Sequence, residues 1–144
     1  MLIGEYIHAI DEKNRLSLPS KFRKEMGKKV IVSPGLDGCL FVFTAQSWKG
    51  IASQLSERGM LQSDNRGFNR RMLGLAVEAD VDAIGRILVP EHLRSLAGIK
   101  TKVAVIGVEN RLEIWDESEW KKYKDGVESQ ADALAEKLGQ VGVL

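Results

Sequence analysis

The sequence predicts an α+β fold rich in β-strands, built as two tandem pseudo-symmetric halves with flanking helices. The first observation is a motif, Asp-x-x-x-Arg followed by a hydrophobic strand and a proline, at residues 11–19 and again at 82–90. The second is that the two copies keep one register: their offset is 71 residues, and later matches at 40–43 and 112–115 lie 72 residues apart. A unit that covers half of a 144-residue chain and occurs twice indicates a duplicated domain.

Each repeat is expected to begin with a β-hairpin. In the first repeat, β-rich and alternating residues predict strands over 6–10 and 15–18, with a turn at 11–14. Asn14 stands where the second repeat has Gly85, and these two residue types best tolerate a positive φ angle. Further strands are expected at 30–32, 39–43, 103–106 and 112–115.

Helices are expected after the strands of each repeat. Pro19 is expected to begin a short helix that Gly27 ends. Thr44 is placed to cap a helix whose apolar face has helical spacing. The apolar positions of that helix are Trp48, Ile51 and Leu55.

Two more helices complete the expected chain. Residues 63–76 predict a linking helix with Asp64 as its N-cap. Asp116 is placed to cap a C-terminal helix that runs without a break to Gly139. Residues 140–144 are expected to fray.

The net charge of +1 conceals a division between the repeats. Residues 1–72 carry 12 Lys and Arg against 7 Asp and Glu, whereas residues 73–144 carry 9 against 13. The segment 13–29 has a net charge of +6, because Glu25 is its single acidic residue. The second turn is preceded by Glu78 and Asp80, so the two repeats are expected to present opposite local potentials. A local basic patch can engage phosphates even when the total charge is near zero.

The candidate site lies at the first turn and the helix after it. Arg15 is the candidate for reading base edges, because a bidentate Arg–guanine contact discriminates by roughly 1–3 kcal/mol. Asp11 can hold the Arg15 guanidinium across the turn. An alternative interpretation carries equal weight for Arg15 and is favoured for Arg86: the Asp–Arg pairs only stabilise their turns. The candidate phosphate contacts are Lys13, Lys21, Arg23 and Lys24.

The sequence lacks the patterns of several other classes of protein. Its apolar runs are far shorter than the about 20 residues of a membrane span, so no membrane partner is expected. Cys39 is the single cysteine and no signal-peptide pattern precedes it, which favours the cytoplasm. Neither a catalytic set nor metal-ligand spacing occurs, so we expect no enzyme activity, cofactor, metal or small-molecule substrate.

The duplicated turn resembles the SpoVT-AbrB domain, a swapped-hairpin DNA-binding module. Two copies at this spacing, with Gly-Leu-Asp-Gly-Cys-Leu at 35–40 and Arg-Leu-Glu-Ile-Trp-Asp at 111–116, resemble the MraZ family of bacterial transcriptional regulators over nearly the whole chain. The resemblance implies repeats at 5–47 and 76–119, a helical connection at 48–75, and a C-terminal helix and tail at 120–144. It also implies that the halves interleave into a β-barrel-like body.

The resemblance further implies what the protein binds. The chains would assemble into a homo-oligomeric ring on double-stranded DNA, at short repeated sites upstream of the division and cell-wall gene cluster, and would be associated with the nucleoid. Its DNA contacts would fall on Asp11, Asn14 and Arg15, with Arg86 as the second-repeat counterpart. The alternative is an oligomeric protein-interaction module whose basic patch binds an acidic partner.

Overall fold

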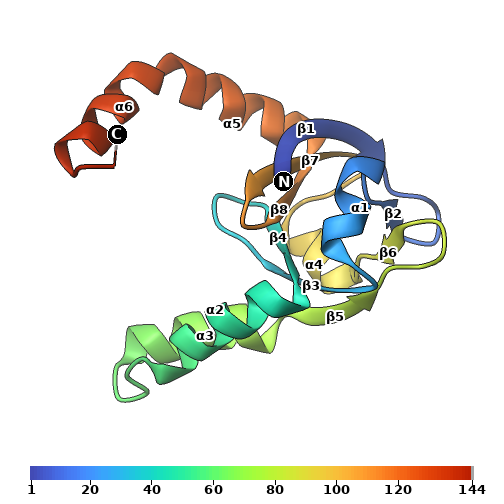
Figure 1. Ribbon diagram of the computed structural model, residues 1–144, viewed down its shortest axis with the longest axis horizontal. Helices are drawn as coiled ribbons and strands as arrows, with labels where there is room; N and C mark the ends of the chain where they lie inside the picture. Colours follow the sequence, from blue (N-terminus) through green and yellow to red (C-terminus); the bar gives the residue numbers. More distant parts are fainter. Residues whose placement is uncertain (144) are drawn as a thin grey trace.

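A computed structural model describes residues 1–143 and shows an antiparallel sheet, a separate two-stranded ribbon and flanking helices (Figure 1). The strands of the large sheet are β1 (Leu2–Ala9), β3 (Lys29–Pro34), β4 (Leu40–Thr44), β5 (Val77–Asp80), β7 (Lys102–Glu109) and β8 (Leu112–Asp116). The ribbon consists of β2 (Arg15–Ser17) and β6 (Arg86–Leu88). The helices are α1 (Ser20–Met26), α2 (Ala45–Glu57), α3 (Ser63–Gly74), α4 (Glu91–Leu96), α5 (Glu117–Ser129) and α6 (Ala131–Gln140).

The two repeats exchange strands within the single chain. The sheet order is β1-β7-β8-β4-β3-β5, so β1 of the first repeat pairs with β7 of the second, and β5 of the second pairs with β3 of the first. Replacing each strand by its repeat counterpart reverses this order, which places an approximate two-fold axis between β4 and β8. The predicted α+β class and the duplication are therefore confirmed.

The predicted β-barrel is wrong, because the sheet stays open. β1 and β5 lie at its two opposite edges. The chain leaves each of these edge strands through a tight turn, and the segments that follow pair with each other as the β2–β6 ribbon. β2 and β6 therefore do not extend the large sheet at β1 and β5 but form a separate second layer. The hydrophobic periodicity predicted the strands but carried no information about this choice of partner.

The sheet separates two hydrophobic clusters. The larger cluster lies between one face and the ribbon with α1 and α4. At its centre Leu16 and Ile87 face each other across the ribbon, with 0% and 1% of their surface exposed. The other face is covered by the helical hairpin α2–α3 and by α5, which bring Met72, Trp48 and Trp120 onto it. The ribbon is therefore a packed layer of the core and not a loose arm.

Most of the expected helix boundaries are confirmed. Pro19 is the N-cap residue of α1, and Gly27 ends that helix with a φ of 75°. The Thr44 side chain accepts a hydrogen bond from the Ser47 N–H at 3.1 Å and caps α2, as predicted. β1 is longer than expected and begins at Leu2.

Two helix predictions are wrong. The N-cap of α3 is Gln62. Asp64 lies in the first turn of the helix, where its negative charge interacts favourably with the positive end of the helix dipole. The C-terminal helix is not continuous but divides at Gln130, whose φ is −115°. Just before this break, the Ser129 hydroxyl donates to the Gly126 carbonyl at 2.8 Å, a type of back-bond that bends helices. Leu144, part of the expected frayed tail, lies outside the described residues.

The hairpin turns occupy one end of the molecule, and the protruding helices occupy the other. In Figure 1 the turns before β2 and β6 project from the right of the body, while α2–α3 and α5–α6 extend away to the left. None of the helices within residues 1–143 is both long and apolar enough to cross a membrane.

Candidate nucleic-acid interface

The first loop is held by one carboxylate. Asp11 Oδ1 accepts the backbone N–H groups of Lys13 at 2.8 Å and of Arg15 at 2.9 Å, and its Oδ2 accepts Arg15 Nε at 2.9 Å. The Asn14 N–H closes the turn on the Asp11 carbonyl at 3.0 Å. Within the described chain, the hydrogen bonds of the Arg15 side chain use Nε, so its terminal amino groups are available to a ligand. The predicted Asp11–Arg15 contact is confirmed.

The second loop repeats this arrangement. Asp82 Oδ1 accepts the N–H groups of Ile84 at 3.1 Å and of Arg86 at 2.8 Å, and Oδ2 accepts Arg86 Nε at 2.8 Å. Asn14 and Gly85 have φ angles of 63° and 85°, which confirms the expected positive-φ residue in each turn. A hairpin of this shape leaves the guanidinium at its mouth in both repeats.

Each loop is tied to the strand of the other repeat. The Leu18 N–H donates to the Gly85 carbonyl at 2.9 Å, and the Val89 N–H donates to the Asn14 carbonyl at 2.9 Å. These two bonds extend the ribbon by one residue at each end. Since each loop depends on the other repeat for its support, the two loops form one rigid unit.

Both motif arginines lie on the outer face of the ribbon. The register pairs Arg15 with Leu88 and Ser17 with Arg86. The central pair, Leu16 and Ile87, points into the core, so alternation directs its neighbours outward. Arg15 and Arg86 are diagonal neighbours on this face, a relation that separates Cα atoms by about 7–8 Å. The site thus presents two guanidinium groups on one two-stranded ribbon.

The basic residues of α1 flank the ribbon but play unequal parts. Lys21 and Lys24 are exposed. Arg23 is half-buried, and its Nε donates to the Leu18 carbonyl at 2.9 Å. A Cβ at Gly85 would overlap the Arg23 guanidinium, so this side chain also supports the second loop. Its repeat counterpart, Arg94, donates in the same way to the Val89 carbonyl at 3.1 Å. Arg23 therefore has a structural contact that the sequence analysis did not foresee.

Strand exchange mixes the charges of the two repeats. The acidic residues before the second loop, Glu78 and Asp80, lie beside Lys29 of the first repeat, at 3.6 and 3.8 Å from its Nζ. These pairs are exposed and contribute little stability, but they place opposite charges side by side. The basic and acidic halves of the sequence are therefore not separate halves of the molecule. The two loops differ in charge through the residues within them: the first has Glu12 and Lys13 where the second has Ala83 and Ile84.

Both loop carboxylates are ionised at neutral pH. The Arg15 backbone N–H, followed by the Arg15 side chain and the Lys13 N–H, lowers the pKa of Asp11 below its ordinary value of 3.8. The pKa of Asp82 is lowered in the same way by Arg86 and the Ile84 N–H. Each aspartate consequently keeps its negative charge against the arginine that it orients.

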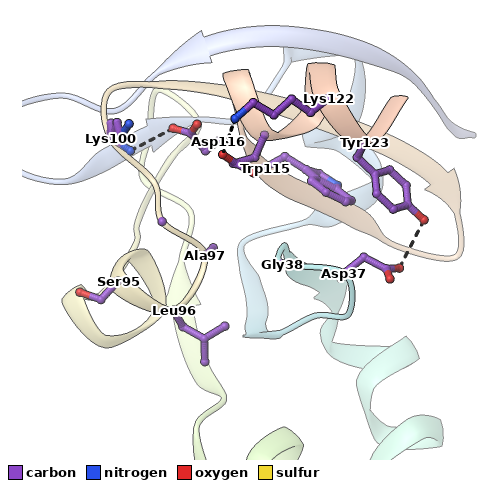
Figure 2. A pocket seen from close by; sticks show the side chains of 12 residues that line it. Asp37, Gly38, Ser95, Leu96, Ala97, Lys100, Trp115, Asp116, Lys122 and Tyr123 are labelled. Atoms are coloured by element: carbon purple, nitrogen blue, oxygen red, sulfur yellow. Dashed lines mark hydrogen bonds and ion pairs between the residues drawn. The ribbon is translucent and has the colours of Figure 1, made fainter. Parts of the chain in front are cut away.

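A cavity away from the ribbon is lined by carboxylates that bind other groups of the fold. Figure 2 shows this cavity of about 710 Å³ between α4, β8, α5 and the β3–β4 turn. Tyr123 Oη contacts Asp37 Oδ2 at 3.4 Å, and Asp116 accepts the Lys100 N–H at 3.2 Å and the Ser118 hydroxyl at 2.9 Å. Its carboxylates are thus engaged within the fold. Among residues 1–143, no group of His, Cys, Asp and Glu side chains is arranged to hold a metal.

Cys39 has no sign of reactivity. Its side chain is buried, and burial raises the pKa of its thiol to about 12. A thiol with so high a pKa stays protonated near neutral pH and is a poor nucleophile.

The structure is a strand-exchanged tandem repeat that presents two Asp–Arg loops on one two-stranded ribbon. The family described as "MraZ protein, putative antitoxin-like" matches residues 1–71 and again 72–140. The chain is 40% identical over 143 residues to the transcriptional regulator MraZ of Acetivibrio thermocellus, which covers 99% of this chain and 100% of the relative. It is 42% identical over the same coverage to the transcriptional regulator MraZ of Caldanaerobacter subterraneus.

A third relative, the transcriptional regulator MraZ of Moorella thermoacetica, is 42% identical over 138 residues and 96% of each chain. The chain belongs to the MraZ family. This membership confirms the predicted resemblance and places the protein among transcriptional regulators, not enzymes.

The sequence analysis missed one feature of the ribbon surface. Ile84 and Leu88 are large aliphatic residues on or beside the second loop, and both are exposed. The signal was present, because the offset of 71 residues aligns them with Lys13 and Ser17 of the first repeat.

Proposed function

We propose that this protein is a sequence-specific DNA-binding regulator of transcription and that the β2–β6 ribbon enters the major groove. The observation that carries the proposal is the pair of outward arginines, Arg15 and Arg86, each oriented by an aspartate on one rigid ribbon. The major groove of B-DNA admits a two-stranded ribbon, and guanine presents two acceptors there to an arginine. The transcriptional role of the relatives supports the same conclusion.

The proposal gives each residue of the site a role. Arg15 reads a base edge, while Asp11 and Asn14 fix its direction by holding the turn. The exposed amino groups of Lys13, Lys21 and Lys24 contact phosphates. Arg23 contacts the DNA backbone with its terminal amino groups only, because its Nε donates to the Leu18 carbonyl and its side chain packs against Gly85. Arg86 makes the second base-edge contact.

An oligomer would strengthen this binding. One ribbon spans only a few base pairs, and several ribbons on one duplex turn later contacts into intramolecular ones, which raises avidity by about 10²–10⁴-fold. Half-exposed apolar side chains on α5 and α6 offer surface for contact between copies, among them Val127, Leu134 and Leu138. By family resemblance, the assembly is a ring on short repeated promoter sites of the division and cell-wall genes, in the cytoplasm and on the nucleoid.

Selection of bound fragments from a random duplex pool tests this function. We expect enrichment of one short motif in tandem, and competition by that duplex but not by a scrambled one at the same salt concentration. Equal competition by both duplexes would support the alternative, in which the basic patch binds an acidic protein partner. The salt concentration must be fixed, because phosphate contacts make affinity strongly salt-dependent.

The two arginines are expected to contribute unequally. Arg86→Ala should weaken binding less than Arg15→Ala, because Ala83 and Ile84 supply no phosphate contact beside Arg86, whereas Lys13 lies beside Arg15. The Arg86 loss should fall near the lower end of roughly 1–3 kcal/mol. Titration of both variants against the selected duplex by fluorescence anisotropy measures the difference. Equal losses would show that the loops contact DNA equivalently.

A further inference from the structure

The second loop and its strand carry two aliphatic side chains that the core does not use. Ile84 and Leu88 are 60% and 56% exposed, whereas Ile87, between them in sequence, is the residue that the ribbon buries. In the first repeat the corresponding positions hold Lys13 and Ser17. Both loops have the same hydrogen-bonded frame. The repeats therefore differ here in the chemistry of their surface and not in their backbone.

These two side chains are held on the proposed binding surface. Leu88 lies directly across the ribbon from Arg15, and Arg86 precedes it by two positions on the same face. The Ile84 N–H is bound to Asp82 Oδ1 at 3.1 Å, which fixes the tip of the second loop. The result is an aliphatic surface beside two guanidinium groups on one rigid ribbon.

We infer that Ile84 and Leu88 contact the 5-methyl groups of thymines in the major groove and so specify thymine beside the bases that the arginines read. This inference rests on the proposed function. The thymine methyl is the one apolar group that a base pair presents in the major groove, and an aliphatic side chain is its natural complement. The first loop has Lys13 and Ser17 at these positions and lacks this capacity.

The neighbouring charges favour DNA over an apolar protein surface as the occupant. An apolar protein surface that covered Leu88 would also cover the adjacent Arg15 and Arg86. Their aspartates bind Nε, so the terminal amino groups of both guanidinium groups would be buried without acceptors, which is unfavourable. The edges and phosphates of a duplex supply acceptors for these guanidinium groups while the methyl groups meet the aliphatic side chains. One ligand thus satisfies both kinds of side chain on the ribbon.

Replacement of thymine by deoxyuridine tests the inference, because it removes the methyl group and keeps the base pairing and the charge. Two duplexes with the motif selected from the random pool are compared, one with thymine and one with deoxyuridine throughout. Wild-type protein is expected to bind the deoxyuridine duplex about fourfold more weakly for each contacted thymine. The Ile84→Ala/Leu88→Ala variant is expected to bind both duplexes equally.

The matched control is Leu61→Ala, which shortens an aliphatic side chain that is 92% exposed between α2 and α3. This control should keep the wild-type preference for thymine. Equal binding of the two duplexes by wild-type protein would overturn the inference and leave the proposed function intact, since selectivity over a scrambled duplex would persist. A double variant that still prefers thymine would also overturn it. Absence of selectivity for any duplex would instead refute the proposed function and the inference with it.

Discussion

Arg15→Ala is expected to abolish selective DNA binding while the protein remains folded. The truncation removes a base contact worth roughly 1–3 kcal/mol at each ribbon, and the loss recurs at every ribbon of an oligomer bound to one duplex. The fold should survive because Arg15 lies on the outer face and its partner, Asp11, is exposed to water once the ion pair is lost. Gel-shift titration against the selected and scrambled duplexes, together with a thermal melt, measures both effects.

The matched control for this variant is Arg58→Ala, which removes an exposed arginine at the end of α2. Figure 1 shows that end of the molecule far from the ribbon. Arg58→Ala should keep the selectivity of the wild type. Selective binding by the Arg15→Ala protein at wild-type strength would remove Arg15 from the site and favour the interpretation that the Asp11–Arg15 pair only stabilises its turn.

Leu16→Ala is expected to have the largest effect on stability. Leu16 is fully buried at the centre of the ribbon, opposite Ile87, and truncation of such a leucine costs about 2–5 kcal/mol through lost burial and the cavity left behind. A loss of this size is a large part of the total stability of a small domain, about 5–15 kcal/mol. The same change should weaken DNA binding, because Arg15 is the next residue of the ribbon.

Urea denaturation at a fixed protein concentration measures this loss, since assembly would make the midpoint depend on concentration. Leu61→Ala is again the control, because the exposed fraction of that side chain is 92% and its truncation should change stability by less than about 0.5 kcal/mol. A Leu16→Ala protein as stable as this control would mean that the ribbon is not part of the cooperative core.

The local structure of the loops could be predicted because it depends on residues close together in sequence. Asp11, Asn14 and Arg15 form their turn within five positions, and the same pattern at residues 82–86 provided an internal check. The helix starts at Pro19 and Thr44 were predictable for the same reason. Each of these features is determined by one residue and its near neighbours.

The pairing of the strands could not be predicted in this way. β1 and β7 are separated by most of the chain, and hydrophobic alternation identifies a strand without identifying its partner. This is why Lys29 was not expected beside Glu78 and Asp80. The barrel was expected from the family resemblance, and the open sheet contradicts that expectation. The support that Arg23 gives to the loop at Gly85 could not be predicted, because these two residues belong to different repeats and meet only in the folded protein.

The approximate symmetry of the ribbon gives the molecule a direction along a duplex. A body made of two identical halves would have a true two-fold axis through the Leu16–Ile87 pair, and such proteins match palindromic sites. Here one loop ends in Lys13 and Asn14 and the other in Ile84 and Gly85. Under the proposed function, each protomer therefore distinguishes a site from its reverse complement. Successive sites for an assembly of such protomers would be direct repeats that all point the same way.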